Sequence, residues 1–141
     1  MIGPRGRFHL LPRWAKRLDW LPVPAKAPDD ALIVFEEPGK LSIRNWNPDG
    51  PEIISRFHQL AQDGDLELLR LIQDRYARLS IPRERRVYLG SQALQHLSLP
   101  LDRKLKSSVY VVVSANRIDL ISPNLRNELL VTGNPELDDL P

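Results

Sequence analysis

Two stretches of the chain share one pattern of apolar and polar positions. The first is 31–46, with the sequence ALIVFEEPGKLSIRNW, and the second is 108–123, with the sequence SVYVVVSANRIDLISP. Each has an apolar run, a short turn, and then a segment in which apolar and polar residues alternate, which is the period of a strand with one buried face. The pattern therefore predicts two equivalent strand pairs. Written one above the other without a gap, the stretches align their apolar positions: Leu32 with Val109, Val34 with Val111, Leu41 with Ile118 and Ile43 with Leu120.

A second pair of similar segments precedes the strand pairs. These are 11–18, LPRWAKRL, and 99–105, LPLDRKL, which match when Leu11-Pro12 is placed on Leu99-Pro100. In each copy we expect a strand to lead into the Leu-Pro step and the proline to open a short helix. The first copy is longer between its two pieces, and its additional residues lie in 20–30, whose prolines disfavour a helix or a central strand. Two pairs of similar segments that occur in the same order predict an internal duplication.

Residues 51–79, between the two copies, are predicted to form a helical hairpin. Gly64 is expected to end the first helix, and Asp65 to cap the second. Both helices carry an apolar stripe, and we expect these stripes to face the core. The stripe of the first helix is Ile53, Ile54, Phe57, Leu60 and Ala61, and that of the second is Leu66, Leu69, Ile72 and Tyr76.

These elements predict one compact α+β domain over 1–141, made of two β-rich half-repeats joined by the helical hairpin. The first repeat is expected at 5–46 and the second at 83–130. A short last helix is predicted over 123–131, with Ser122 as its cap. Residues 132–141 are acidic and contain Gly and Pro, which is typical of a frayed tail.

The composition bears on chemistry mainly through what is missing from the sequence. There is no cysteine, which excludes disulfides, thiolate zinc sites and cysteine nucleophiles. His9, His58 and His96 lack metal-type spacing, and no phosphate loop or nucleophile-elbow motif occurs. We therefore predict no metal, no cofactor and no catalytic residue, and expect the protein not to be an enzyme. No apolar run reaches the ~20 residues of a membrane span, and no secretory leader is recognisable, so a cytoplasmic protein is expected.

The net charge of +2 hides an uneven distribution of charged residues. Residues 1–17 carry +5, 18–74 carry −6, 75–106 carry +6, and the remainder carries −3. Clustered Lys and Arg attract polyanions, because neutralising phosphates dominates nucleic-acid affinity. The other interpretation is a solvated surface of mixed sign without a partner.

The order of strand, short basic helix and strand pair, occurring twice around helices, resembles the MraZ family of tandem AbrB-like swapped-hairpin units. That family has an Asp-x-x-Gly-Arg turn, strand residues, an Ile-Pro step and then Leu-Arg a few positions on. Residues 6–12, GRFHLLP, look like this motif with one extra residue, and Lys16 and Lys104 match the family's arginine with charge retained. Residues 116–122 resemble the family's second strand and its step into a final helix.

The second copy departs from the family pattern. Residues 92–96, QALQH, stand where its acidic residue and Gly-Arg are expected. Residues 78–82, RLSIP, offer another register but lack the glycine. We prefer the register at Leu99-Pro100, because it keeps the following strands at the right distance.

The resemblance implies interlocked hairpins, a ring-like homo-oligomer and binding to double-stranded DNA. It further implies a nucleoid-associated transcriptional regulator acting at repeated sites upstream of a division and cell-wall gene cluster. The alternative is a DNA-silent oligomerising interaction module that retains the fold, which the missing Gly-Arg of the second copy favours. No small-molecule ligand is evident. The candidate DNA-binding residues are Arg5, Arg7, Arg13, Lys16 and Arg17 in the first copy, and Arg83, Arg85, Arg86, Arg103 and Lys104 in the second.

Overall fold

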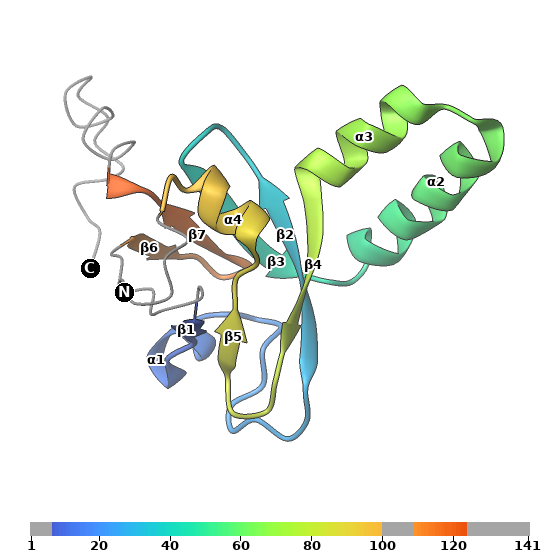
Figure 1. Ribbon diagram of the computed structural model, residues 1–141. Coiled ribbons are helices and arrows are strands. Elements are labelled where there is room, and N and C mark those ends of the chain that lie inside the picture. Colours follow the sequence, from blue (N-terminus) through green and yellow to red (C-terminus); the bar gives the residue numbers. More distant parts are fainter. Residues whose placement is uncertain (1–6, 100–108, 124–141) are drawn as a thin grey trace.

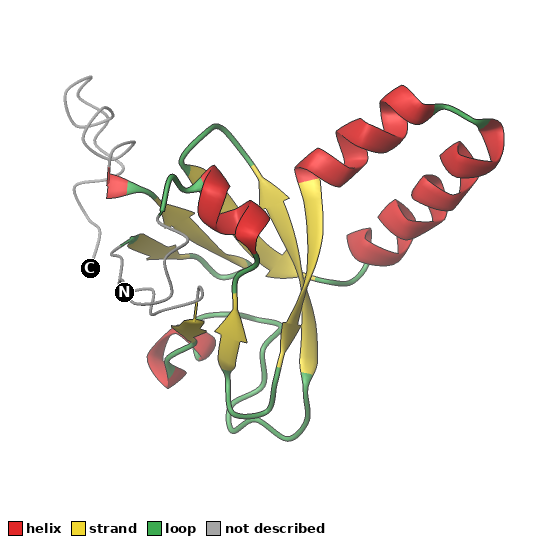
Figure 2. Cartoon of the chain, in the orientation of Figure 1, coloured by secondary structure: helices red, strands yellow, loops and turns green. Residues whose placement is uncertain are grey.

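The computed structural model describes residues 7–99 and 109–123 of the chain (Figure 1). Over these residues the architecture is α+β: antiparallel strands form one larger and one smaller sheet, accompanied by helices (Figure 2). The elements are β1 (Arg7–His9), α1 (Pro12–Ala15), β2 (Asp29–Phe35), β3 (Lys40–Asn45), α2 (Asp49–Asp63), α3 (Leu66–Arg75), β4 (Tyr76–Ile81), β5 (Arg86–Tyr88), α4 (Ser91–His96), β6 (Tyr110–Val113) and β7 (Arg117–Ile121).

The core lies between one face of the larger sheet and the smaller sheet with its helices. The larger sheet has the order β4-β2-β3-β7-β6, and the smaller sheet pairs β1 with β5. Ile33 and Ile43 stand opposite each other on the buried face of the larger sheet. Phe8 and Val87 are their counterparts from the smaller sheet, and all four are part of one buried apolar cluster. A single core therefore joins the two halves of the sequence.

The pairing between strands reveals an internal two-fold relation. β3 and β7 pair so that Ser42 stands opposite Asp119, which is its own equivalent in the alignment of the two strand pairs. β1 and β5 pair in the same manner, with Phe8 opposite Val87. A pairing in which a residue meets its own repeat equivalent is what a two-fold axis between two copies produces. The predicted equivalent strand pairs are confirmed as β2–β3 and β6–β7.

The predicted register of the second copy is wrong. The strand and short helix equivalent to β1 and α1 are β5 and α4, in an alignment that matches Phe8 with Val87. Residues 92–96, where the acidic residue and Gly-Arg turn of the family were expected, lie in α4 instead, and 78–81 lie in β4. The reason is burial: Leu18 and Leu97, which this alignment matches, are both core residues, and the register at Leu99-Pro100 does not reproduce that match.

The alignment of the first strands in each pair also shifts by one residue. Phe35 pairs with Leu41 across the first turn, and Val113 pairs with Ile118 across the second. The second turn is thus one residue shorter, and Val111 is equivalent to Ile33, not Val34. The same shift replaces the predicted pairing of Leu32 with Val109. Because side chains alternate between faces, a one-residue error would have put Val111 on the wrong side of the sheet.

The helical hairpin forms with the predicted turn, but its second helix ends at Arg75 instead of near 79, and the hairpin does not face the core. Gly64 ends α2 in the left-handed conformation, with φ of 72°, and the Asp65 carboxylate accepts a hydrogen bond from Leu68 N. However, α2 and α3 project from the sheet as a two-helix arm (Figure 1). No residue of α3 is buried, and Leu66 and Leu71 are 75% and 59% exposed. Tyr76, assigned to the helical stripe, begins β4 instead, because the chain leaves α3 to pair with β2.

Three further expectations concern parts of the chain near its ends. The leading Arg5, the last helix and the acidic tail lie outside the described residues. Ser122, the predicted cap of that helix, is buried beside the end of β7. Among the helices that the structure describes, none has the length and apolar character needed to cross a bilayer.

Candidate nucleic-acid interface

The two-stranded sheet β1–β5, here called the basic ribbon, presents one buried and one exposed face. Side chains alternate on both strands, so the central residues Phe8 and Val87 point inward and are 1% and 0% exposed. The flanking residues are all exposed. Because directly opposed residues share a face in an antiparallel pair, these side chains lie together on the outer face. They are Arg7 opposite Tyr88, and His9 opposite Arg86.

Local contacts hold α1 against the basic ribbon. The ring of Phe8 stacks on that of Trp14, with centroids 5.6 Å apart, and Ala15 is also buried. Pro12 stands in the first turn, where its missing N–H costs nothing. The Arg13 guanidinium lies 5.8 Å from the centroid of the Trp14 ring, a cation–π distance. The helix therefore carries its basic residue, Arg13, next to the ribbon.

The structure separates the predicted DNA-binding residues into three groups. Arg5, Arg103 and Lys104 lie outside the described residues. Arg85 is buried, with 8% of its surface exposed. The others are exposed and are concentrated on the ribbon, on α1 and the residues just after it, and on the turn before β5: Arg7, Arg13, Lys16, Arg17, Arg83 and Arg86.

Arg85 has a structural role that the sequence did not suggest. Its Nη1 lies 2.9 Å from Oδ2 of Asp29, and its Nη2 donates to the carbonyl of Pro22 at 3.4 Å. Its φ is 62°, in the left-handed region that favours glycine. The alignment of Phe8 with Val87 makes Arg85-Arg86 the second copy's equivalent of Gly6-Arg7. The apparent lack of a second Gly-Arg thus reflects replacement of the glycine, while the arginine after it is kept.

Sequence reasoning missed two side chains of the outer face, His9 and Tyr88. Tyr88 is 57% exposed, unusual for a large aromatic residue. The only available signal was the alternation of 7–9 and 86–88, and these segments are too short to identify without knowing that they pair. Asp19 and Glu84 are exposed acidic residues close in sequence to this basic surface.

A polar cluster surrounds the two-fold position in the larger sheet. Glu36 lies 3.2 Å from both Lys40 Nζ and Arg44 Nη2. Burial acts to raise the pKa of Glu36, but hydrogen bonds and charge, chiefly from Lys40, lower it below the ordinary value of 4.5. Burial raises the pKa of the Asp119 carboxyl above 3.8, opposed by the positive charge of Arg117. The cations of this cluster are thus engaged by neighbouring carboxylates and are poor candidates for contacting a polyanion.

His96 is matched with Arg17 of the first copy by the alignment of Phe8 with Val87. Its hydrogen bonds connect α4 to the turn between β2 and β3. Its Nε2 lies 2.9 Å from the carbonyl oxygen of Glu37 and 2.8 Å from that of Lys40. Both neighbours are acceptors, so Nε2 carries the proton and donates. Its backbone carbonyl accepts from Gly39 N at 2.8 Å. The residue is structural, and across 7–99 and 109–123 no group of three or more His, Asp or Glu could hold a metal ion.

Comparison with known proteins adds no assignment: no protein-family model matches the sequence, and none of the curated proteins matches it.

Proposed function

We propose that this chain is a sequence-specific DNA-binding protein that contacts duplex DNA through the basic ribbon and α1. The observation that carries the proposal is the outer face of the ribbon, where each copy contributes one arginine, Arg7 and Arg86. Arg86 lies two residues before Tyr88, the cross-strand partner of Arg7. The two arginines are therefore diagonal neighbours across the ribbon, roughly 7–8 Å apart. Within the described part of the chain, neither arginine has a carboxylate partner that would account for its position.

A two-stranded ribbon has the right dimensions for reading DNA. The major groove of B-DNA is about 12 Å wide and admits an antiparallel pair of strands. Arginine pairs bidentately with guanine there, so Arg7 and Arg86 are assigned to base contacts. Arg13, Lys16 and Arg17 on and after α1, and Arg83 in the turn before β5, are assigned to phosphates, which fix position without reading sequence.

The internal two-fold relation supports a target with approximate two-fold symmetry. The pairing of β1 with β5 places the two arginines in equivalent positions, whereas His9 and Tyr88 are equivalent positions with different side chains. We therefore expect a site whose two halves share the base read by arginine and differ beside it. In both β1–β5 and β3–β7, a strand of one copy pairs with a strand of the other. This pairing between copies supports an MraZ-like swapped-hairpin architecture.

The MraZ resemblance extends the proposal to the biological role. On that basis the protein is a nucleoid-associated transcriptional regulator of a division and cell-wall gene cluster, acting as a ring-like homo-oligomer. Binding to repeated sites would then multiply weak contacts, because each further contact becomes intramolecular.

The test compares binding of single variants to a duplex selected from a random pool. Arg7→Ala and Arg86→Ala should each relax base preference by ~1–3 kcal/mol, whereas Lys16→Ala should lower the salt slope by about one and leave preference intact. Arg70→Ala, which removes an exposed arginine from the arm, is the matched control and should bind like the parent. Equal behaviour of Arg7→Ala, Arg86→Ala and Arg70→Ala would refute the ribbon as the reading surface.

A DNA-silent interaction module is the second candidate. It is favoured by Gly90-Ser91, which replaces the aliphatic-Pro step in the second copy, and by exposed apolar residues on the arm. Failure of the parent to bind any duplex at low salt, together with concentration-dependent self-association in light scattering, would make this the better description.

A further inference from the structure

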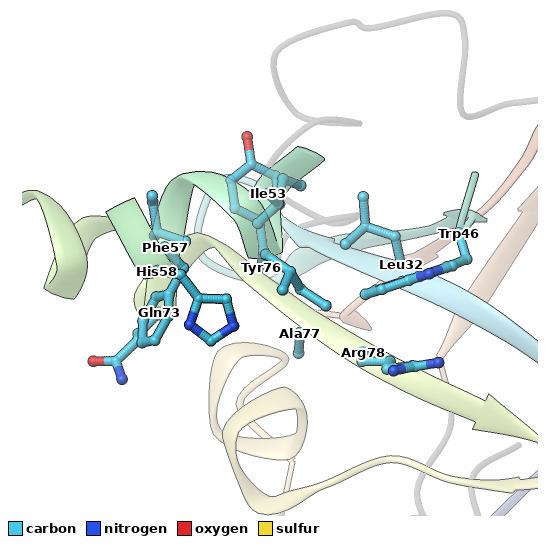
Figure 3. A pocket seen from close by; sticks show the side chains of 11 residues that line it. Leu32, Trp46, Ile53, Phe57, His58, Gln73, Tyr76, Ala77 and Arg78 are labelled. Carbon is cyan, nitrogen blue, oxygen red and sulfur yellow. The ribbon is translucent and has the colours of Figure 1, made fainter. Parts of the chain in front are cut away.

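A hollow of about 370 Å³ lies between the arm and the larger sheet (Figure 3). Its walls come from β2, the residue that follows β3, both arm helices and β4. The interior is apolar, and the polar side chains of His58, Gln73 and Arg78 line it at separate points (Figure 3). Apolar cavities of about 300–1,000 Å³ with few polar groups are typical of small-molecule sites. The main apolar side chains are Leu32, Trp46, Ile53, Phe57, Ile72 and Tyr76.

The wall formed by Trp46 is fixed before any ligand arrives. Gly50, in the first turn of α2, packs directly against the Trp46 ring, and a Cβ there would lie 2.5 Å from Cε2 and Cε3. Gly50 N also donates to Trp46 O at 2.6 Å. The Arg78 guanidinium lies 4.5 Å from the ring centroid (Figure 3). Trp46 thus contacts both a helix and a cation.

Neighbouring groups orient the Arg78 guanidinium, and the side chain still has N–H donors for a ligand. Its Nη2 donates to Oδ2 of Asp30 at 2.8 Å, and the contact with Trp46 further orients the guanidinium. An arginine has five N–H donors, and within 7–99 and 109–123 only Nη2 of this side chain has a hydrogen-bond partner. Nη2 carries two N–H groups and Asp30 takes one, so one of the two parallel forks of the guanidinium, Nε with Nη2 or Nη1 with Nη2, remains open to a carboxylate.

We propose that this hollow binds a small amphipathic carboxylate, with its hydrocarbon part among Ile53, Phe57 and Ile72 and its carboxylate at Arg78. A single negative charge fits better than a phosphate dianion, because Asp30 already neutralises part of the Arg78 charge. The hollow is near the lower end of ligand-site volumes, which suits a molecule of about ten heavy atoms rather than a partner helix.

A molecule bound in the hollow would contact the segments that connect the arm to the sheet. Trp46 precedes the connection into α2, and Tyr76 immediately follows α3, so both chain connections of the arm contribute to the wall. A bound molecule would fill the space between arm and sheet and hold the arm at one angle. This inference does not rest on the proposed DNA binding, and its experiment contains no nucleic acid.

The experiment uses octanoate as the probe and the indole N–H signals of the full-length protein in ¹H–¹⁵N spectra. The chain has three tryptophans, and within the described residues only Trp46 lines the hollow. Octanoate should shift the Trp46 signal, identified with Trp46→Phe, in a saturable manner. The signals of Trp14 and Trp20 should stay in place and serve as internal controls. 1-Octanol, which keeps the chain and lacks the charge, should bind about 10-fold more weakly.

Three variants locate the carboxylate. Arg78→Met should weaken octanoate binding about 10-fold and leave octanol unchanged, whereas Arg70→Met, elsewhere on the arm, should change neither. Asp30→Asn removes the competing carboxylate and should tighten octanoate binding several-fold, an effect that damage to the fold would not produce. The proposal is overturned if octanoate leaves the Trp46 signal unmoved, if octanol binds as tightly as octanoate, or if Asp30→Asn weakens binding. Capture of an acidic peptide in place of octanoate would assign the hollow to a protein partner and equally refute it.

Discussion

Replacing Arg85 by Ala and by Gly separates two effects that this one residue combines. Its guanidinium, in a side chain only 9% exposed, pairs with Asp29, while its backbone holds a φ of 62°. Both substitutions remove the side chain, and only glycine removes the conformational strain. The difference between them therefore reports on the backbone alone.

The magnitudes follow from the surroundings of Arg85. Loss of the ion pair with Asp29 and of the hydrogen bond from the charged Nη2 to Pro22 O costs ~1.5–3 kcal/mol, and Asp29, 31% exposed, can recover some of it from water. Loss of the buried aliphatic stem adds about 1–2 kcal/mol. Arg85→Ala should thus lower the free energy of unfolding by about 3–4 kcal/mol. The left-handed conformation costs a non-glycine residue ~1–2 kcal/mol, partly offset by the greater freedom of glycine when unfolded, so Arg85→Gly should lose about 1 kcal/mol less.

Urea unfolding followed by circular dichroism measures both variants beside the parent. In a thermal scan, a difference of about 1 kcal/mol in a domain of this size separates Arg85→Gly from Arg85→Ala by roughly 3–4 °C. The usual order, with alanine more stable than glycine, would show that position 85 does not hold a positive φ. The alignment of Arg85 with Gly6 would then rest on the pairing of Phe8 with Val87 alone.

Two further substitutions test packing and ionisation. Gly50→Ala should destabilise by about 1–3 kcal/mol in urea unfolding, because the clash of its Cβ with Trp46 exceeds the gain in helix propensity of up to ~1 kcal/mol; an unchanged or higher stability would contradict this packing. Asp119→Asn tests the pKa that burial raises above 3.8. Asp119 is neutral in both states at low pH, and the folded state is penalised as the pH rises through the raised pKa. The stability of the variant relative to the parent should therefore increase from acidic to neutral pH, and a decrease would contradict the raised pKa.

Local causes explain the elements that could be predicted from the sequence. The alternation in 40–45 and 117–121 sufficed to predict β3 and β7, because one face of each strand must be buried. Gly64 and Asp65 sufficed to locate the turn of the arm, since a left-handed glycine and a capping carboxylate act on backbone groups within a few residues. The match between repeated segments was enough to predict a duplication.

Only the tertiary structure shows how the two copies pair and which surfaces this pairing forms. β1 and β5 have 3 residues each, too few to be found by periodicity, and their pairing joins segments from different halves of the chain. That pairing brings Arg7 and Arg86 to one face, withdraws Arg85 from the surface and displaces the predicted register. The arm is a further example, because the apolar stripe of α3 predicted a buried face that the structure leaves uncovered. Amphipathicity indicates which face of a helix is apolar, but it does not indicate what covers that face. Propensity and caps depend on neighbouring residues, whereas register, exposure and the hollow beside Trp46 depend on the fit of surfaces far apart in the chain.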